Sequence, residues 1–152
     1  MKTLLTFVLL TAFFVNAFAT PSPVQPAAAG GDSATYTLTV TIVNVARRTG
    51  TLYVGLANSD ATFTGDSYRK TRADVPATGD GQVSFEGLPA GRYAVRVYQD
   101  LNGNQMLDRA GQMPTEPFGF SNVPMLMGPP SFGQCAFTLD GSKTVVVSLM
   151  SL

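Results

Sequence analysis

The chain has 152 residues, with 10 basic and 10 acidic side chains, no histidine and one cysteine. This length allows one ordinary domain, and the balanced charge gives no electrostatic footprint for nucleic acid or an anionic membrane. One cysteine excludes an internal disulfide. The absence of histidine excludes a Ser-His-Asp triad, a Cys-His pair and histidine-based metal sites.

The N-terminal residues are typical of a secretory signal peptide. Lys2 is followed by the apolar run Leu4–Val15 and by the small-residue triplet Ala17–Ala19. We therefore expect residues 1–19 to be removed on export, which places the protein in the periplasm or outside the cell. The apolar run is too short to span a bilayer comfortably, so we expect no stable membrane insertion.

The next stretch, residues 20–33, is small and Pro-rich and keeps no period. Such composition is typical of a flexible linker. We expect it to lead into one folded domain over residues 34–152.

Alternating apolar and polar residues indicate β-strands along this domain. The expected strands lie at Tyr36–Val43, Thr51–Ala57, Gly81–Glu86, Arg92–Tyr98, Ser131–Leu139 and Lys143–Leu149, with one short edge strand inside Asn58–Ala77. Leu88–Gly91 favours a tight turn, and Asp140-Gly141 is typical of a hairpin. With no convincing helix, the pattern predicts an all-β fold, an antiparallel β-sandwich of about seven strands.

One long irregular loop, Arg109–Pro130, interrupts this pattern with five prolines and no period. Loops of this length are uncommon in compact domains and tend to be functional or disordered. Its apolar residues argue against disorder. Phe118 and Phe120, with Tyr98 of the preceding strand, either form a platform for a sugar or peptide or cover the end of the sandwich.

The stretch after the Arg92 strand places oxygen atoms at alternate positions. These are the side chains of Asp100, Asn102, Asn104 and Asp108, and the carbonyl of Met106. Calcium prefers six to eight oxygen ligands, which the EF-hand loop takes from a similar spacing. The spacing therefore predicts a candidate calcium loop.

The strongest ligand of the EF-hand pattern is missing, because its final Glu position is Gly111. Glu116 lies within reach and could complete the shell. The expected affinity is weak, about 10⁻⁴–10⁻³ M, as in extracellular modules. The alternative is that the Asp and Asn side chains cap turns through their own hydrogen bonds.

The same carboxylates allow a catalytic alternative, a hydrolase that acts on polysaccharide or peptide. Asp100, Asp108 or Glu116 would serve as acid or base, but a surface loop offers no apolar pocket to raise a pKa. Cys135 is expected to be a buried small hydrophobe. We therefore expect a non-catalytic module with a structural or binding role and no cofactor besides weakly bound Ca²⁺. Its partner would be an envelope or extracellular protein or glycan.

Four segments carry a family resemblance: G-T-L-Y-V-G-L, F-E-G-L-P-A-G-R-Y-A-V, D-L-N-G-N-Q-M-L-D and E-P-F-G-F-S-N. Together they resemble the bacterial secreted family catalogued as domain of unknown function twenty-one forty-one, from about Thr35 to the C-terminus. The F-x-x-L-P-x-G-x-Y part is also similar to transthyretin-like and carboxypeptidase-regulatory-like modules. The resemblance implies an exported Ig-like or prealbumin-like sandwich with no assigned activity. Members of the family tend to have glycine after the second Asn of the loop, where this chain has Gln105.

Overall fold

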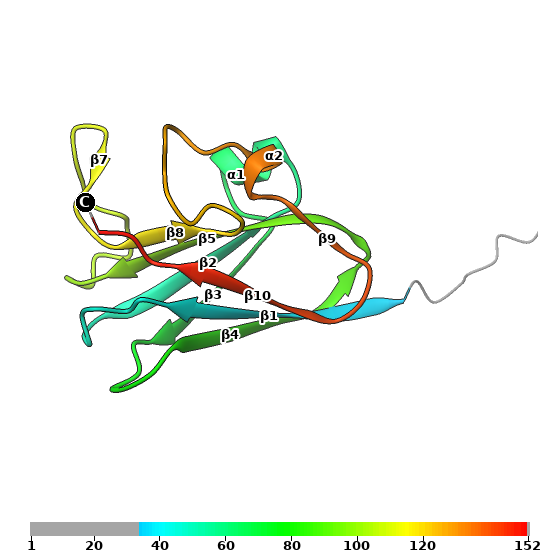
Figure 1. Ribbon diagram of the computed structural model, residues 1–152, viewed down its shortest axis with the longest axis horizontal. Coiled ribbons are helices and arrows are strands. Elements are labelled where there is room, and N and C mark those ends of the chain that lie inside the picture. Colours follow the sequence, from blue (N-terminus) through cyan, green and yellow to red (C-terminus); the bar gives the residue numbers. More distant parts are fainter. Residues whose placement is uncertain (1–33, 152) are drawn as a thin grey trace, which may run out of the picture. The chain divides into compact units, whose positions relative to one another are not determined.

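Threonine alternates with apolar residues through the first strand, β1 (Thr35–Val43), and three of its apolar side chains, Leu38, Val40 and Ile42, are 0% exposed. Because successive side chains of a strand point to opposite faces, this alternation gives β1 one core face and one outer face. The computed structural model describes residues 34–151. It is an all-β fold with two main sheets and two short helices (Figure 1).

The first sheet has three strands in the order β10-β1-β4 and contains both pairing directions. β4 (Gly81–Pro89) runs antiparallel to β1, whereas β10 (Lys143–Ser148) runs parallel to it. The prediction of an antiparallel arrangement is therefore wrong for β1 and β10. Alternation fixes which face of a strand is buried, but it does not fix the direction of the neighbouring strand.

The second sheet has the order β3-β2-β5-β8, and β9 pairs with the first residues of β5. Its strands are β2 (Thr51–Ala57), β3 (Arg69–Asp74), β5 (Gly91–Asp100), β8 (Phe118–Phe120) and β9 (Phe137–Leu139). β3 is the edge strand predicted between Asn58 and Ala77. Only Ala90 separates β4 from β5, so the predicted turn carries the chain from one sheet to the other.

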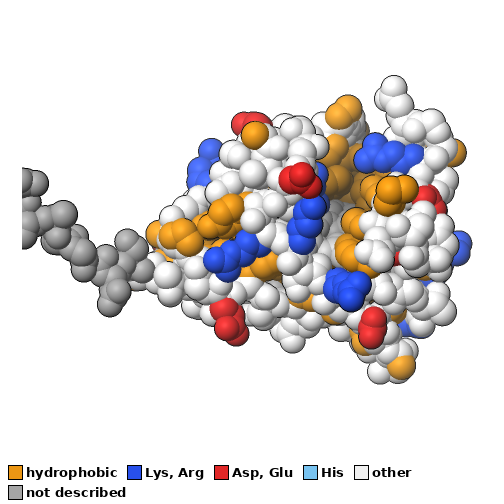
Figure 2. Space-filling view, turned by 180° about the vertical axis from the view of Figure 1, so that it is seen from behind, with side chains coloured by type: hydrophobic (Ala, Val, Ile, Leu, Met, Phe, Trp, Pro, Cys, Tyr) orange, Lys and Arg blue, Asp and Glu red, His pale blue; other side chains and the backbone are white. Residues whose placement is uncertain are grey.

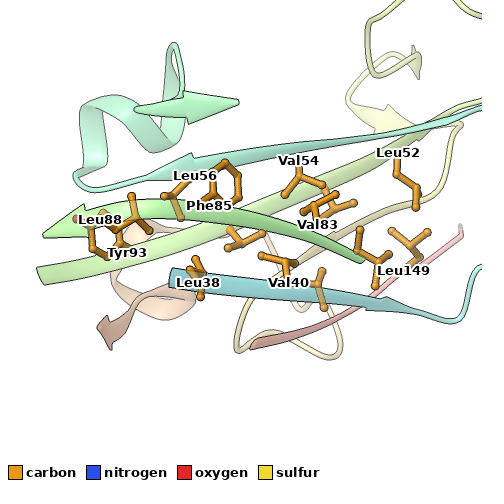
Figure 3. Close-up of a cluster of buried hydrophobic side chains, with 14 of the residues drawn as sticks. Leu38, Val40, Leu52, Val54, Leu56, Val83, Phe85, Leu88, Tyr93 and Leu149 are labelled. Atoms are coloured by element: carbon orange, nitrogen blue, oxygen red, sulfur yellow. The ribbon is translucent and has the colours of Figure 1, made fainter. Parts of the chain in front are cut away.

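The main hydrophobic core lies between the two sheets. Figure 3 shows side chains of β1, β2, β4 and β5 gathered in one cluster, among them Leu38, Leu52, Val54 and Phe85. Fully burying one Leu, Val or Phe side chain is worth roughly 1.5–3 kcal/mol. A core of this kind accounts for folding without a disulfide.

The predicted strand Ser131–Leu139 is wrong in its first half. Residues Phe132–Cys135 form the short helix α2, and only Phe137–Leu139 pair as a strand. The Ser131 side chain accepts from the Gln134 backbone while Gln134 reaches back to Ser131, which makes a capping box. This capping box favours a helical turn, and it prevails over the apolar alternation that favours a strand. Cys135 is nevertheless buried, as predicted.

A second helix, α1 (Asp60–Thr64), was not predicted and begins with a capping box between Ser59 and Thr62. α1 and α2 lie beside each other above the second sheet (Figure 1). Their side chains Phe63, Phe132 and Cys135 pack with Ala57 and Ala94 of the sheet in a second hydrophobic cluster.

The long segment Arg109–Pro130 is only partly irregular. β6 (Arg109–Ala110) and β7 (Met113–Pro114) pair as a small hairpin, and β8 joins the second sheet. The Asp140-Gly141 turn links β9 to β10, but these strands pair with different sheets. The hairpin prediction is therefore wrong there, although the turn itself is present.

The predicted signal peptide and linker, residues 1–33, lie outside the described residues. Within residues 34–151, no helix has the length and apolar character that a membrane crossing requires.

Candidate functional site

Aromatic and basic side chains collect on the outer face of the second sheet, which is turned away from the main core. Directly opposed residues of an antiparallel sheet share a face. From β3 to β8, one cross-strand row is Arg72, Tyr53, Tyr98 and Phe118, and the next row is Lys70, Gly55, Arg96 and Phe120. The register thus brings two tyrosines, two phenylalanines and three cations from four strands onto one surface.

The two helices cover one end of this face. Ala57 and Ala94 oppose each other there, and their small side chains leave room for α1 and α2. The Phe63 ring lies 6.0 Å from Phe120 and 6.4 Å from Phe132, measured between centroids. This aromatic contact joins the helices to the sheet and leaves the other end of the face uncovered by them.

A groove of about 1120 Å³ lies on this face and reaches α1 at Phe63 and Thr64. The rest of its lining comes from the second sheet, the β6–β7 hairpin and the segment around Leu126 and Pro130. Three lining residues are basic, namely Lys70, Arg96 and Arg109, and none within residues 34–151 is acidic. Figure 2 shows hydrophobic side chains in a hollow of the surface with basic side chains beside them.

Two stacked tyrosines of the second sheet form part of the groove floor. The Tyr53 and Tyr98 rings lie 5.2 Å apart between centroids and are inclined by only 10°. The Tyr98 hydroxyl donates to the Gln105 carbonyl oxygen at 2.7 Å. Burial, then the neighbouring Tyr53 and two nearby carboxylates, raise the pKa of Tyr98. The phenol therefore keeps its proton and remains a donor at neutral pH.

Arg96 is held firmly against the groove wall. Its guanidinium donates to the carbonyl oxygens of Phe63 and Gly65 and to Ser67 Oγ at 2.8 Å. It also lies 5.6 Å from the centroid of the Phe63 ring. Burial lowers the pKa of Arg96, against a smaller opposite effect of Asp66, but a guanidinium stays charged. Arg96 thus ties the chain around α1 to β5 and places a positive charge beside the groove.

The loop after β5 is organised by the Asp100 carboxylate. Asp100 Oδ1 accepts from the backbone N–H of Asn102 at 3.2 Å and of Gly103 at 2.7 Å. Asp100 Oδ2 accepts from the backbone N–H of Gln105 at 2.8 Å. Burial raises the pKa of Asp100, but these backbone donors outweigh it and lower the pKa below 3.8. They also hold Gln105 in a left-handed backbone conformation, with φ 64°.

Asp108 is bound by the two asparagine side chains of the loop. Asn102 Nδ2 donates to Asp108 Oδ2 at 2.6 Å, and Asn104 Nδ2 donates to Asp108 Oδ1 at 2.8 Å. The Oδ1 atoms of Asn102 and Asn104 accept from the backbone N–H of Asn104 and Met106. The Met106 side chain is 64% exposed.

Glu116 joins the two ends of the same loop. Its Oε1 accepts from the backbone N–H of Leu101 at 2.8 Å, and its Oε2 accepts from that of Asp108 at 3.1 Å. Glu116 is only 5% exposed. One carboxylate therefore clamps residues seven positions apart in the sequence.

The structure thus brings the predicted cation ligands together as a hydrogen-bonded turn. The carboxylate oxygens of Asp100, Asp108 and Glu116 all accept hydrogen bonds from the chain itself. In the part of the chain that the structure describes, no three or more His, Cys, Asp or Glu side chains are grouped to hold a metal ion. Calcium binding remains a prediction.

The predicted aromatic platform has a different arrangement. Phe118 is only 2% exposed and lies edge-on to Phe120, with 5.9 Å between centroids, so it forms part of the floor. Tyr98 and Phe120 are half-buried. Sequence reasoning missed Tyr53 and the cations Lys70 and Arg109. The outward position of Tyr53 in its strand is readable from the alternation, but its partner across the sheet is not.

Comparison with family models identifies the chain. A family described as an uncharacterized protein conserved in bacteria (DUF2141) matches residues 40–147, a range that runs from β1 to β10. No curated protein matches the chain, and no solved structure does. The match covers all four segments that carry the resemblance in the sequence. The chain therefore belongs to the bacterial DUF2141 family.

Proposed function

We propose that the protein is an exported, non-catalytic binding module of the cell envelope or the extracellular space. Its scaffold would be an Ig-like or prealbumin-like sandwich, and its ligand would lie in the groove on the outer face of the second sheet. The observation that carries this proposal is the groove of about 1120 Å³, lined by aromatic and apolar side chains with a few polar ones. Ligand sites are typically concave and mainly apolar, with a small number of polar groups that fix orientation.

The groove also has the rigid support that a binding site needs. Its floor is β-sheet, which carries the Tyr53–Tyr98 stack, and the Tyr98 hydroxyl anchors the Asp100–Asp108 loop at Gln105. A site on regular elements is more precise than one on free loops. In our proposal the clamped loop keeps the groove open, with or without weakly bound Ca²⁺ in that loop.

The state of the titratable groups supports a binding role over the hydrolase alternative. Asp100 and Glu116 are buried and use both carboxylate oxygens on backbone donors. None of the three loop carboxylates lines the groove. Burial raises the pKa of the Cys135 thiol to about 11, which disfavours a reactive thiolate.

The proposal is tested by mapping ligands onto the groove by NMR. The processed chain is isotope-labelled and titrated with a panel of peptides, polyuronate oligosaccharides and fatty acids. We expect at least one class to shift the amide signals around Tyr53 and Arg109, and the shifts to disappear in Tyr53→Ala. A panel that leaves these signals unchanged would contradict the proposal.

The same panel distinguishes the enzyme alternative. Hydrolysis of any member that is lost in both Asp108→Asn and Glu116→Gln would favour a hydrolase. Export is tested separately by N-terminal sequencing of the mature protein, which we expect to begin at Thr20.

A further inference from the structure

We propose that the occupant of the groove is an acidic segment of a partner protein that carries large apolar side chains. This inference rests on the proposed binding function and specifies the partner.

The charge of the groove has one sign. Lys70, Arg96 and Arg109 line it, and no lining residue between positions 34 and 151 is acidic. One of these cations, Lys70, forms an ion pair with Asp66 at 2.9 Å, but the Asp66 and Lys70 side chains are 98% and 63% exposed. An ion pair this exposed contributes little and exchanges readily. A partner with carboxylates therefore complements the groove.

The cations are distributed along the groove. Lys70 lies on the edge strand β3, Arg96 on the central strand β5 and Arg109 on the β6–β7 hairpin. Neighbouring strands are spaced about 4.8 Å apart, so the backbones of β3 and β5, two strands apart, lie about 10 Å from each other. Arg109 lies on a hairpin outside this sheet. An occupant with several separated carboxylates can pair with cations on all three elements, which favours an acidic peptide segment over a fatty acid with its single head group.

The apolar part of the lining favours a peptide over an acidic glycan. Beside polar residues such as Thr71 and Gln112, the lining includes Leu107, Met113 and Leu126, which offer no partner to sugar hydroxyls, and hydroxyls buried without a hydrogen bond are costly. Leu, Phe or Met side chains of a peptide would instead bury apolar area against them.

Exposed methionines lie at or next to groove-lining residues in the sequence. Met106, Met113, Met125 and Met127 are 64%, 56%, 71% and 92% exposed. Methionine is flexible and polarizable, and it is frequent on surfaces that adapt to partner side chains. All four lie between the end of β5 and α2, in the chain that forms the groove wall and its surroundings.

The experiment measures binding of one synthetic peptide and its two matched relatives to the processed chain. The probe is a fluorescent peptide of alternating glutamate and leucine or phenylalanine. One relative has lysine in place of glutamate, and the other has serine in place of the apolar residues. We expect only the first peptide to bind at the groove, with an affinity that falls as salt is raised, because rim charges are screened.

Charge reversal on the protein provides the matched test. Arg109→Glu is expected to lower the affinity for the acidic peptide by about tenfold or more, because it replaces attraction by repulsion at the rim. Arg47→Glu makes the same charge change at an exposed residue outside the groove and should leave binding within about twofold. Both variants should melt like the wild type, since neither arginine makes a side-chain hydrogen bond or ion pair among the described residues.

Three results would overturn the inference. Binding of a polyuronate oligosaccharide or of oleate at the groove, without the acidic peptide, would refute the partner class but leave the binding function intact. Equal losses of affinity in Arg109→Glu and Arg47→Glu would show that the peptide responds to the overall charge of the protein and does not bind in this groove. If no probe perturbs residues of the groove, both the inference and the proposed function fail.

Discussion

Replacing Glu116 by glutamine tests whether one carboxylate holds the loop after β5. In the wild type, each Glu116 oxygen accepts one backbone N–H, from Leu101 and from Asp108. Glutamine keeps one acceptor and puts an NH₂ group in the place of the other. That group faces a backbone donor, so one charge-assisted hydrogen bond is lost and a backbone N–H loses its partner.

The size of the effect follows from the burial of this carboxylate. A hydrogen bond to a charged group is worth about 1.5–3 kcal/mol. Because Glu116 is 5% exposed, water cannot readily replace the lost acceptor. We expect the free energy of unfolding to fall by about 2 kcal/mol. At about 4 °C per kcal/mol for a domain of this size, Tm should fall by about 8 °C.

The assay is thermal unfolding by circular dichroism, with the wild type, Glu116→Gln and the control Glu86→Gln in parallel. Glu86 is an exposed residue of β4 whose side chain makes no hydrogen bond in the described part of the chain. The control should melt within about 1 °C of the wild type, because surface substitutions usually have small effects. If Glu116→Gln has the same Tm as the Glu86→Gln control, the reasoning is refuted.

Repeating the melts with chelator and with calcium separates the two interpretations of the loop. If the loop is only a hydrogen-bonded clamp, Glu116→Gln should lower Tm by the same amount with chelator and with calcium. A calcium site with a dissociation constant of about 0.3 mM would stabilise the wild type by about 0.9 kcal/mol at about 1 mM calcium, and Glu116→Gln would abolish that gain. Superimposed wild-type melts would refute calcium binding.

Three further predictions concern the same region and the second core. The pKa of Asp100 is lower in the folded state than its ordinary value of 3.8. The stabilisation from this carboxylate is therefore fully present above pH 3.8 and is lost as the pH falls through the folded pKa. Urea titrations at decreasing pH should therefore show a steeper loss of stability in the wild type than in Asp100→Asn, and parallel curves would contradict this. Gln105→Gly should raise the free energy of unfolding by about 0.5–1 kcal/mol, because glycine tolerates a φ of 64° at little cost; a lower Tm would count against it. The Cys135 thiol, with its pKa raised to about 11 by burial, should react with iodoacetamide at pH 8 only after denaturation, whereas equal labelling of native and denatured protein would exclude the buried position.

The candidate site could be found only in part from the sequence. The Asp100–Asp108 loop could be predicted, because Asp and Asn at alternate positions indicate a polar turn within a short stretch of sequence. The structure brings Asp100, Asp108 and Glu116 into one hydrogen-bond network there. The groove was not found, because Tyr53 and Tyr98 are 45 positions apart in the sequence and meet only through the register of β2 on β5. Register is a property of the pair of strands and not of either one.

What the sequence alone determined is the set of strands with one buried face, since the period of two residues and the β-branched side chains act locally. Only the tertiary structure decided how these strands pair. It placed β10 parallel to β1 and sent the chain on either side of the Asp140-Gly141 turn to different sheets. The physical reason is that each strand buries its apolar face equally well against several neighbours, and the packing of the whole core selects one of them.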